Sequence, residues 1–404
     1  MQVITLCRVC NSKNIKGFFN LGTQPLANSL AKDANQKEDL YSLSLSWCQD
    51  CNLVMLNETI DPKILFSEYV WVTGTSGVAK NHSQYFFDQV SSRSPKKRYV
   101  LEIASNDGTF LVPFIKNGYE VLGVDPAQNI VEVANKNGVP TQCSFFNMQT
   151  AFDLVKQKGK ANIVFARNVL PHVANTRDFV ESLSLCLAED GVLAIEVHYA
   201  KKILEGLHYD SIYHEHVCYF TLKSLEKLLN DFNLHVFDIS ESPISGGSII
   251  VYAKHGNVKE EPILQQYREK ELEDKVNDLG SWQHFAETSH GHRQQLTEML
   301  KEANREGMVA GYGASARSST MLNFANVGPD LISVIADQNP LKQGLFAAGT
   351  HIPIVSPQEM IKRNPATIVI LSWNFANEIA DILRNKYGYK GRLIIPLPNI
   401  PKIL

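Results

Sequence analysis

The chain has 404 residues, of which 44% are hydrophobic and 20% are charged, and its formal net charge is −3. This is the composition of an ordinary soluble protein, and a small negative charge gives no basis for a nucleic-acid-binding surface. No apolar run approaches the roughly 20 residues of a membrane helix and no signal-peptide pattern is visible, so we expect a cytoplasmic protein without membrane or nucleic-acid partners.

Two Cys-x-x-Cys pairs, Cys7 with Cys10 and Cys48 with Cys51, lie in the first part of the chain. Four thiolates close the tetrahedral shell of one zinc ion and leave no position for water. An odd total of seven cysteines also fits a reducing compartment better than a disulfide framework. We therefore predict a structural zinc site in a β-rich module over 1–75, with a redox dithiol as the alternative. The other cysteines are predicted to be buried small hydrophobic residues: Cys143, Cys186 and Cys218.

From about residue 98 onward the chain alternates strand and helix patterns. This alternation predicts an α/β fold, in which a parallel sheet is covered by helices on both faces. We assign residues 76–256 to this unit. Its predicted strands are 98–103, 118–125, 161–166 and 191–197.

The first of these strands runs into a glycine-containing turn over residues 101–108 that opens a helix. The next strand ends at Asp125, about 17 residues later, where a carboxylate can bind both ribose hydroxyls of a nucleoside cofactor. This spacing does not distinguish S-adenosylmethionine (SAM) from NAD, and a turn without a ligand is a further alternative. The predicted cofactor-binding residues are Glu102, Ser105, Asn106, Gly108, Asp125 and Asn168.

Tyr213-His-Glu-His216 is the densest run of titratable groups in the chain. A histidine beside a carboxylate and a phenol suits general base catalysis near neutral pH. A polar surface loop is the alternative, and a metal site lacks an obvious third ligand. In an extended segment His214 and His216 would share one face, whereas a turn would separate them. His172, after the third predicted strand, is equally compatible with a site and with packing.

Residues 257–306 are polar and helical in pattern and connect to a second α/β unit, and we group both as 257–404. In this unit Gly311-Tyr-Gly-Ala-Ser-Ala316 fits the dinucleotide fingerprint, and Asp337 follows about 21 residues later. A nicotinamide-dependent oxidoreductase is therefore the main alternative function. The same helix start could instead bind a substrate diphosphate. The predicted strands are 307–313, 331–337, 366–372 and 392–396.

Taken in order, these motifs resemble the SAM-dependent C-methyltransferases of deoxysugar biosynthesis, which methylate C3 or C5 of nucleotide-linked 4-keto sugars. The resemblance covers essentially the whole chain. Besides the cysteine pairs, it rests on residues 21–28, 69–76, 105–109, 213–216, 246–248, 311–314 and 372–376.

The resemblance implies a zinc-binding module, a central Rossmann-like SAM domain and a C-terminal Rossmann-like domain that helps hold the nucleotide sugar without NAD. It implies that His216 removes the proton next to the ketone, after which the enolate carbon takes the methyl group. Glu215, Tyr213 and His172 are then its active-site companions, and Tyr69 faces the sugar.

The resemblance also implies that the nucleotide sugar contacts Gly247, Gly313, Ala314 and Arg317. At Trp71 the customary Tyr-x-Tyr of the family reads Tyr-x-Trp. Two further positions depart from the family pattern. Ser245 precedes Gly246-Gly247 where a histidine is common, and Arg317 stands where a lysine is common. These departures leave the sugar and its nucleotide open, and the sequence does not indicate the oligomeric state.

Overall fold

The computed structural model describes residues 2–66, 73–75, 77–94 and 98–404. The N-terminal part forms an antiparallel sheet with the strand order β11-β4-β3-β2 and a separate β1-β5 pair. Strand β11 comes from the middle of the chain, so the sheet is not built from the N-terminal residues alone. The bounds are Gln2–Val3 for β1, Ile15–Gln24 for β2, Tyr41–Cys48 for β3, Val54–Leu56 for β4, Glu58–Thr59 for β5 and Cys218–Tyr219 for β11.

The central unit is a seven-stranded sheet in the order β12-β13-β10-β9-β6-β7-β8. Strands β8, β7, β6, β9 and β10 are parallel, and β13 and β12 continue the sheet antiparallel. The four predicted strands are confirmed, with small shifts at their ends. The bounds are Tyr99–Ile103 for β6, Glu120–Asp125 for β7, Thr141–Cys143 for β8, Ala161–Arg167 for β9, Leu187–His198 for β10, Leu234–Ser242 for β12 and Ser248–His255 for β13.

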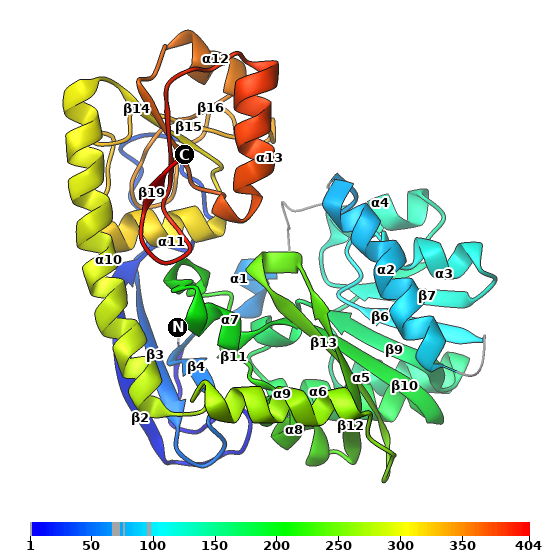
Figure 1. Ribbon diagram of the computed structural model, residues 1–404. Coiled ribbons are helices and arrows are strands. Elements are labelled where there is room, and N and C mark those ends of the chain that lie inside the picture. Colours follow the sequence, from blue (N-terminus) through cyan, green and yellow to red (C-terminus); the bar gives the residue numbers. More distant parts are fainter. Residues whose placement is uncertain (1, 67–72, 76, 95–97) are drawn as a thin grey trace.

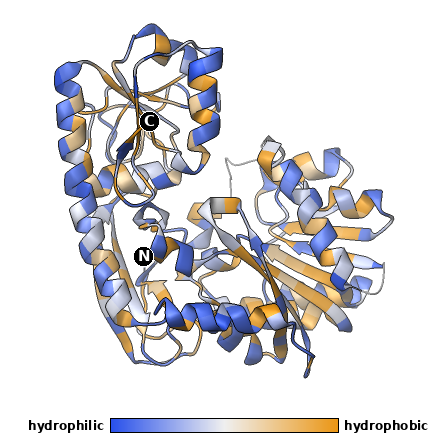
Figure 2. Ribbon diagram, in the orientation of Figure 1, coloured by the Kyte–Doolittle hydropathy of each residue, from blue (hydrophilic) through white to orange (hydrophobic). Residues whose placement is uncertain are grey.

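Helices cover both faces of this sheet, which explains why its strands are continuous apolar runs (Figure 2). On one face, helices α2 and α3 pack aromatic side chains such as Phe86 and Phe114 against Val100. On the other face, α5, α6 and α8 contribute leucines such as Leu183. The bounds are Gly77–Arg93 for α2, Val112–Lys116 for α3, Met148–Lys158 for α5, Thr176–Cys186 for α6 and Leu222–Asn230 for α8.

The C-terminal sheet has the order β16-β15-β14-β17-β18-β19, parallel except for β19. Strand β15 is shorter than the predicted 331–337: only Ile335 and Ala336 pair with β14, opposite Gly311 and Tyr312. The strand bounds are Val309–Tyr312 for β14, Ile335–Ala336 for β15, Ile354–Val355 for β16, Thr367–Ile370 for β17, Arg392–Ile395 for β18 and Lys402–Ile403 for β19, and helix α11 spans Ala316–Ala325.

The predicted helical connection consists of α9 (Pro262–Glu273) and α10 (Leu279–Glu306). Helix α10 runs along both the N-terminal and the C-terminal sheets (Figure 1). Phe285 of α10 packs edge-on against Phe19 of β2, with 5.8 Å between ring centroids. The N-terminal sheet and the C-terminal unit therefore share one hydrophobic core.

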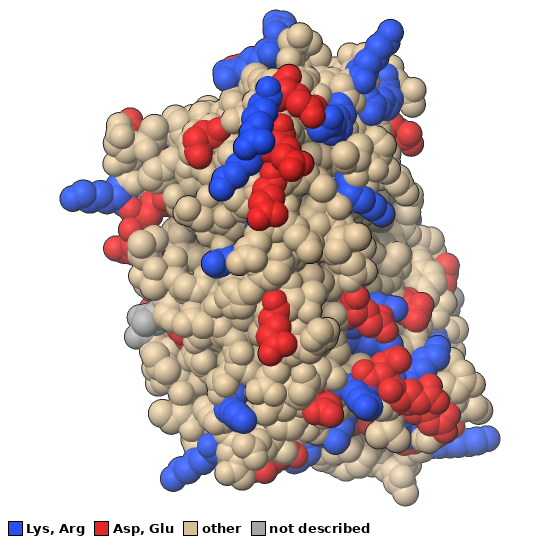
Figure 3. All heavy atoms as spheres, turned by 60° about the vertical axis from the view of Figure 1, so that its left-hand side comes forward, with Lys and Arg blue, Asp and Glu red and all other residues tan. Residues whose placement is uncertain are grey.

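One prediction about the remaining cysteines is wrong. Cys186 and Cys218 are buried as expected, but Cys143 is exposed because it ends the edge strand β8. On the face shown in Figure 3, acidic and basic side chains are interspersed. Within the part of the chain that the structure describes, none of the helices has the length and apolar character required to span a bilayer.

Candidate active site

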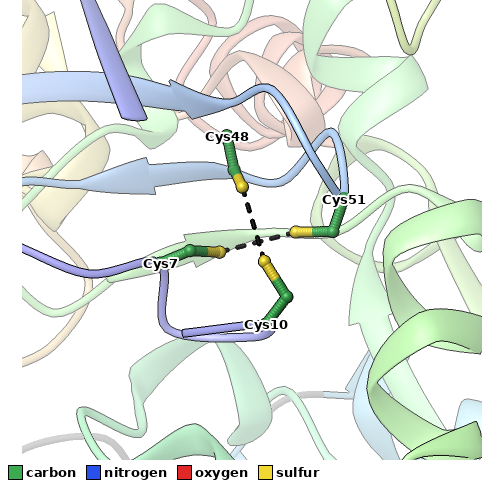
Figure 4. A group of neighbouring side chains, drawn as sticks. All are labelled: Cys7, Cys10, Cys48 and Cys51. Carbon is green, nitrogen blue, oxygen red and sulfur yellow. Dashed lines mark hydrogen bonds between the residues drawn. The ribbon is translucent and has the colours of Figure 1, made fainter. Parts of the chain in front are cut away.

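The four paired cysteines converge on one point (Figure 4), with all Sγ atoms within 4.8 Å of one another. Each pair is followed by an asparagine, Asn11 or Asn52, that has a positive φ and donates its backbone N–H to the carbonyl of the first cysteine. Four thiol ligands in this arrangement suit one tetrahedral zinc ion with a closed shell. The cluster consists of Cys7, Cys10, Cys48 and Cys51.

Hydrogen bonds connect the cysteine cluster to the two segments that carry His172 and His216. Arg8, inside the first pair, donates from Nη2 to the Leu56 carbonyl (3.1 Å) and from Nη1 to the Ala174 carbonyl (3.3 Å). The Leu56 N–H donates in turn to the carbonyl of Val217, the residue after His216 (3.0 Å). Unfolding of the cysteine-containing module would therefore disturb the Tyr213–His216 run, although the four cysteines do not contact that run.

Four neighbouring parallel strands, β7, β6, β9 and β10, end at one edge of the central sheet. Ligands of open α/β sheets bind at the carboxyl ends of such strands. Asp125 ends β7, the turn at Ser105 follows β6, Asn168 follows β9 and His198 ends β10. The predicted cofactor residues thus lie along the edge where this fold binds ligands.

Asp125 is only 6% exposed, and its two oxygens accept the backbone N–H groups of Asn106 (2.9 Å) and Ala127 (3.0 Å). Each oxygen keeps a lone pair for a ligand hydroxyl, as ribose binding requires. Burial raises the pKa of Asp125 above its usual value, although both backbone donors oppose this. The Ser105 hydroxyl lies toward Gly123, where an added Cβ would be 2.3 Å from Oγ, so Ser105 shapes the turn by packing.

The turn after β6 needs residues that tolerate a left-handed backbone. Asn106 has φ 49° and Gly108 has φ 77°, and a Cβ on Gly108 would lie 2.5 Å from Val139. Residues 73–75 cover this turn: Thr73 N–H donates to Asn106 Oδ1 and Gly74 N–H donates to Asp107 Oδ2, both at 2.8 Å. The turn after β6 is therefore fixed both by the strand that leads into it and by hydrogen bonds from residues 73 and 74.

Glu102 lies beneath the turn as a buried carboxyl. Its Oε1 is 3.9 Å from Arg167 Nη1, and its Oε2 is buried without a hydrogen-bond partner. Burial raises the pKa of Glu102 well above its usual value, although Arg167 opposes the shift. Asn168, with φ 50°, donates its N–H to the Glu196 carbonyl at 2.7 Å. The raised pKa of Glu102 favours the neutral carboxyl, which can hydrogen-bond a ligand but carries no charge to attract a cation.

The Tyr213–His216 run forms a turn rather than an extended segment, because His216 N–H donates to the Tyr213 carbonyl at 2.8 Å. The turn brings the Tyr213 hydroxyl to 2.9 Å from His216 Nε2. His216 Nδ1 lies 2.8 Å from the Ser211 carbonyl. A carbonyl oxygen only accepts, so Nδ1 carries the hydrogen and Nε2 has the lone pair in the neutral ring.

His216 is neutral near pH 7. Burial lowers its pKa well below the usual value, and His172 and Arg317 add to this effect while the Ser211 hydrogen bond opposes it. His172 packs edge-on against His216 with 4.7 Å between ring centroids, and burial lowers the pKa of His172 to about 4. The structure therefore brings His172, Tyr213 and His216 together as predicted.

The two other members of the run contact the N-terminal part of the chain, His214 at strand β3 and Glu215 at the loop after β2. His214 Nε2 lies 3.0 Å from the Ser42 carbonyl of β3, so it is engaged away from His216. Glu215 accepts from Asn28 Nδ2 at 2.5 Å, and burial raises the pKa of Glu215 to about 7. Tyr69, the remaining predicted active-site residue, lies outside the described residues.

Side chains of the C-terminal unit pack against the second glycine turn. Asp337 Oδ2 accepts the Ala314 N–H at 2.9 Å, and Lys342 Nζ donates to the Ala314 carbonyl at 2.6 Å. A Cβ on Gly313 would lie 2.0 Å from Ser372 Oγ, so this side chain already packs against the turn. Unlike Asp125, Asp337 has a lysine beside it, with 3.8 Å between Lys342 Nζ and Oδ2.

Arg317, in the first turn of α11, forms a bidentate ion pair with Asp210. Trp373 Nε1 donates to the same carboxylate at 2.7 Å. A Cβ on Gly246 would lie 3.1 Å from Trp373, and one on Gly247 would lie 2.7 Å from Lys202. Both glycines have positive φ, so the loop before β13 packs closely against Trp373 on the C-terminal unit.

Sequence reasoning missed several residues here. His208 lies between Trp373 (ring centroids 4.6 Å apart) and His198 (5.8 Å apart), and each histidine has one buried ring nitrogen without a partner. Burial lowers the pKa of His208 to about 4, so its ring is neutral. The sequence did contain signals for these residues. His198 stands at the end of a predicted strand, and His208 and Asp210 lie close in sequence to the Tyr213–His216 run.

Three families match consecutive parts of the chain. Residues 7–66 match "Putative zinc binding domain", residues 79–239 match "Methyltransferase domain", and residues 243–398 match "C-methyltransferase C-terminal domain". C-methyltransferase NovU of Streptomyces niveus is 31% identical over 411 residues, which cover 100% of this chain and 98% of that protein. Ubiquinone biosynthesis O-methyltransferase of Bartonella quintana (strain Toulouse) is 28% identical over 109 residues, which cover 27% of this chain and 44% of that protein.

Solved structures resemble only part of the chain. The magnesium protoporphyrin IX methyltransferase ChlM from Synechocystis PCC 6803 with bound SAM is 16% identical with a TM-score of 0.37, covering 50% of this chain and 100% of that one. The CcbJ methyltransferase from Streptomyces caelestis is 13% identical with a TM-score of 0.35, covering 44% and 89%.

Proposed function

The chain belongs to the SAM-dependent C-methyltransferases that carry an N-terminal zinc-binding domain, and from this we propose that its acceptor is a nucleotide-linked 4-keto-deoxysugar. Methylation of carbon requires a carbanion, and a neighbouring ketone makes the carbon acidic because the charge spreads onto oxygen as an enolate. The proposal is supported above all by the Tyr213–His216 pair, a neutral imidazole whose lone pair meets a phenol.

We assign His216 Nε2 as the atom that accepts the proton from the carbon next to the ketone. The depressed pKa keeps this nitrogen unprotonated at neutral pH, and the Nδ1 hydrogen bond holds the ring in the required tautomer. The Tyr213 hydroxyl donates to Nε2 in this structure (2.9 Å); when the sugar binds, it turns to the developing enolate oxygen and so frees the Nε2 lone pair to take the proton. The His172 ring packs edge-on against the His216 ring and limits its movement. Glu215 belongs to the same turn, and the role of Tyr69 beside the sugar stays a prediction.

Bound SAM supplies the electrophilic methyl group. Asp125 accepts hydrogen bonds from the ribose hydroxyls, and Asn106 and Gly108 shape the turn that receives the cofactor. Glu102, whose Oε2 is buried without a hydrogen-bond partner, lies in β6 beneath this turn. Ser105 and Asn168 complete the cofactor edge.

We propose that the nucleotide part of the substrate binds between the central and C-terminal units. A cavity of about 440 Å³ lies beside Gly246 and is otherwise lined by C-terminal residues such as Trp373 and Lys402; the four expected contacts named below border it but do not line it. We retain the division of the chain into 1–75, 76–256 and 257–404 as the domain proposal. The expected contacts on the sugar nucleotide are Gly247, Gly313, Ala314 and Arg317.

A panel of nucleotide 4-keto sugars incubated with the enzyme and SAM tests this function. Mass spectrometry is expected to show one added methyl group on a panel member, and NMR locates it on the carbon next to the ketone. Methylation on oxygen or nitrogen, or turnover of NAD with these sugars, would refute the proposal.

A further inference from the structure

The short turn η3 (Tyr209–Ser211) connects the C-terminal unit to the histidine run. Its middle residue, Asp210, is completely buried. Arg317 donates to Asp210 from Nε (2.9 Å) and Nη2 (2.8 Å), and Trp373 Nε1 donates at 2.7 Å. Both donors belong to the C-terminal unit, 107 and 163 residues away in sequence.

The first residue of the turn is held from the same side. The Tyr209 hydroxyl lies 3.0 Å from His292 Nδ1, and His292 Nε2 lies 2.7 Å from the Pro396 carbonyl. Because that carbonyl only accepts, His292 Nε2 carries the hydrogen and Nδ1 accepts from Tyr209. The C-terminal unit thus orients both residues that precede Ser211.

Ser211, the last residue of η3, contacts the proposed base His216. The Ser211 carbonyl accepts from His216 Nδ1 at 2.8 Å, and this contact places the lone pair on Nε2. We propose that Asp210 is a positioning residue: it fixes η3 against the C-terminal unit so that the Ser211 carbonyl selects the reactive tautomer of His216. This inference rests on the proposed role of His216 as the base.

This arrangement makes the tautomer of His216 depend on the packing of the C-terminal unit against η3. If η3 moves away, His216 Nδ1 loses its acceptor and the ring can place its hydrogen on Nε2, which then has no lone pair for the proton. A buried carboxylate with three donors is expensive to disturb, because any released donor or acceptor stays buried without a partner. Within this network Asp210 contacts Arg317 and Trp373, which border the proposed nucleotide site, but it contacts neither His216 nor the SAM-binding turn, so its effect on His216 passes through Ser211.

The test is Asp210→Asn in the full-length protein, which keeps the side-chain shape but removes one acceptor and the charge. The His216 tautomer is read by ¹⁵N NMR of histidine-labelled protein without substrate, with the resonance identified by its loss in His216→Gln. We expect the Nδ1–H tautomer in the wild type and a shift toward Nε2–H in Asp210→Asn. The kcat for methyl transfer should fall by about tenfold or more with SAM affinity unchanged.

Trp373→Phe, which removes one donor and keeps a ring beside His208, should give the same changes to a smaller extent. Glu38→Gln is the matched control, since Glu38 joins a different pair of units through His351 Nε2 and Gly349 N–H, both at 2.7 Å. It should leave the tautomer unchanged. An unaltered His216 tautomer in Asp210→Asn, whatever happens to kcat, would overturn the inference. If no 4-keto sugar reacts with the wild type, the proposed function fails, and the NMR comparison still decides the role of Asp210.

Discussion

His214 and His216, separated by one residue, are engaged by different parts of the molecule. His214 Nε2 lies 3.0 Å from the Ser42 carbonyl in the N-terminal sheet, whereas His216 Nε2 lies 2.9 Å from the Tyr213 hydroxyl within its own turn. The turn between them therefore gives only His216 the environment of an active-site base. His214 has a structural contact instead.

The first prediction concerns this pair. His216→Asn removes the proposed proton acceptor and is expected to lower kcat by at least about 10²-fold, the usual contribution of a positioned base. Exchange of the substrate proton next to the ketone with deuterated water should fall in parallel, while SAM affinity stays the same. His214→Asn is the control and should retain most of both activities. The opposite ranking of the two variants would show that the base is assigned to the wrong residue.

The second prediction concerns the cofactor. Asp125→Ala removes two carboxylate acceptors and should weaken SAM binding by roughly 1.5 to 3 kcal/mol, as measured by calorimetry. Asp337→Ala is the matched control, because Asp337 occupies the equivalent place after β15 but is paired with Lys342. It should leave SAM affinity unchanged. Tight binding of NAD by the wild type, without binding of SAM, would contradict the assignment.

The third prediction concerns the metal. Elemental analysis of the purified protein should find one zinc ion per chain, and Cys48→Ser should lose it together with much of the folded protein, because a structural zinc site contributes directly to folding. Cys143→Ser changes an exposed cysteine outside the cluster and should keep the metal. Stoichiometric zinc in Cys48→Ser would exclude this ligand set.

The fourth prediction concerns pH. Burial raises the pKa of Glu215 to about 7 in the folded protein, whereas a carboxyl in the unfolded chain titrates near about 4.3. The folded protein therefore holds this proton more tightly, and the associated stability is complete below about pH 4 and lost as the pH rises through 7. Glu215→Gln resembles the protonated form and does not titrate. Its free energy of unfolding should exceed that of the wild type increasingly between pH 4 and 7, by about 4 kcal/mol at most.

Denaturant unfolding at a series of pH values measures this difference. Glu181→Gln changes an exposed glutamate and serves as the control, with no expected pH-dependent gain. A constant difference between Glu215→Gln and the wild type from pH 4 to 8 would show that Glu215 titrates normally.

Features with a local physical cause could be predicted from the sequence. A Cys-x-x-Cys pair can present two thiols to one metal wherever the chain goes, so the convergence of the four cysteines followed from their spacing. Continuous apolar runs predicted the parallel strands, because strands covered on both faces exclude polar side chains. The position of Asp125 at a strand end followed from the same pattern.

Other features were decided only by the tertiary structure. Whether His214 or His216 lies in the site depends on a turn whose two sides are held by Ser42 and Ser211, and neither contact has a sequence signature. The pairing of Arg317 with Asp210 joins residues 107 positions apart. Two similar glycine turns differ in their surroundings for the same reason, since packing places Lys342 beside Asp337, whereas the contacts described for Asp125 are backbone N–H groups. Local spacing determines which groups can act together, but the packing of the units determines which of them meet.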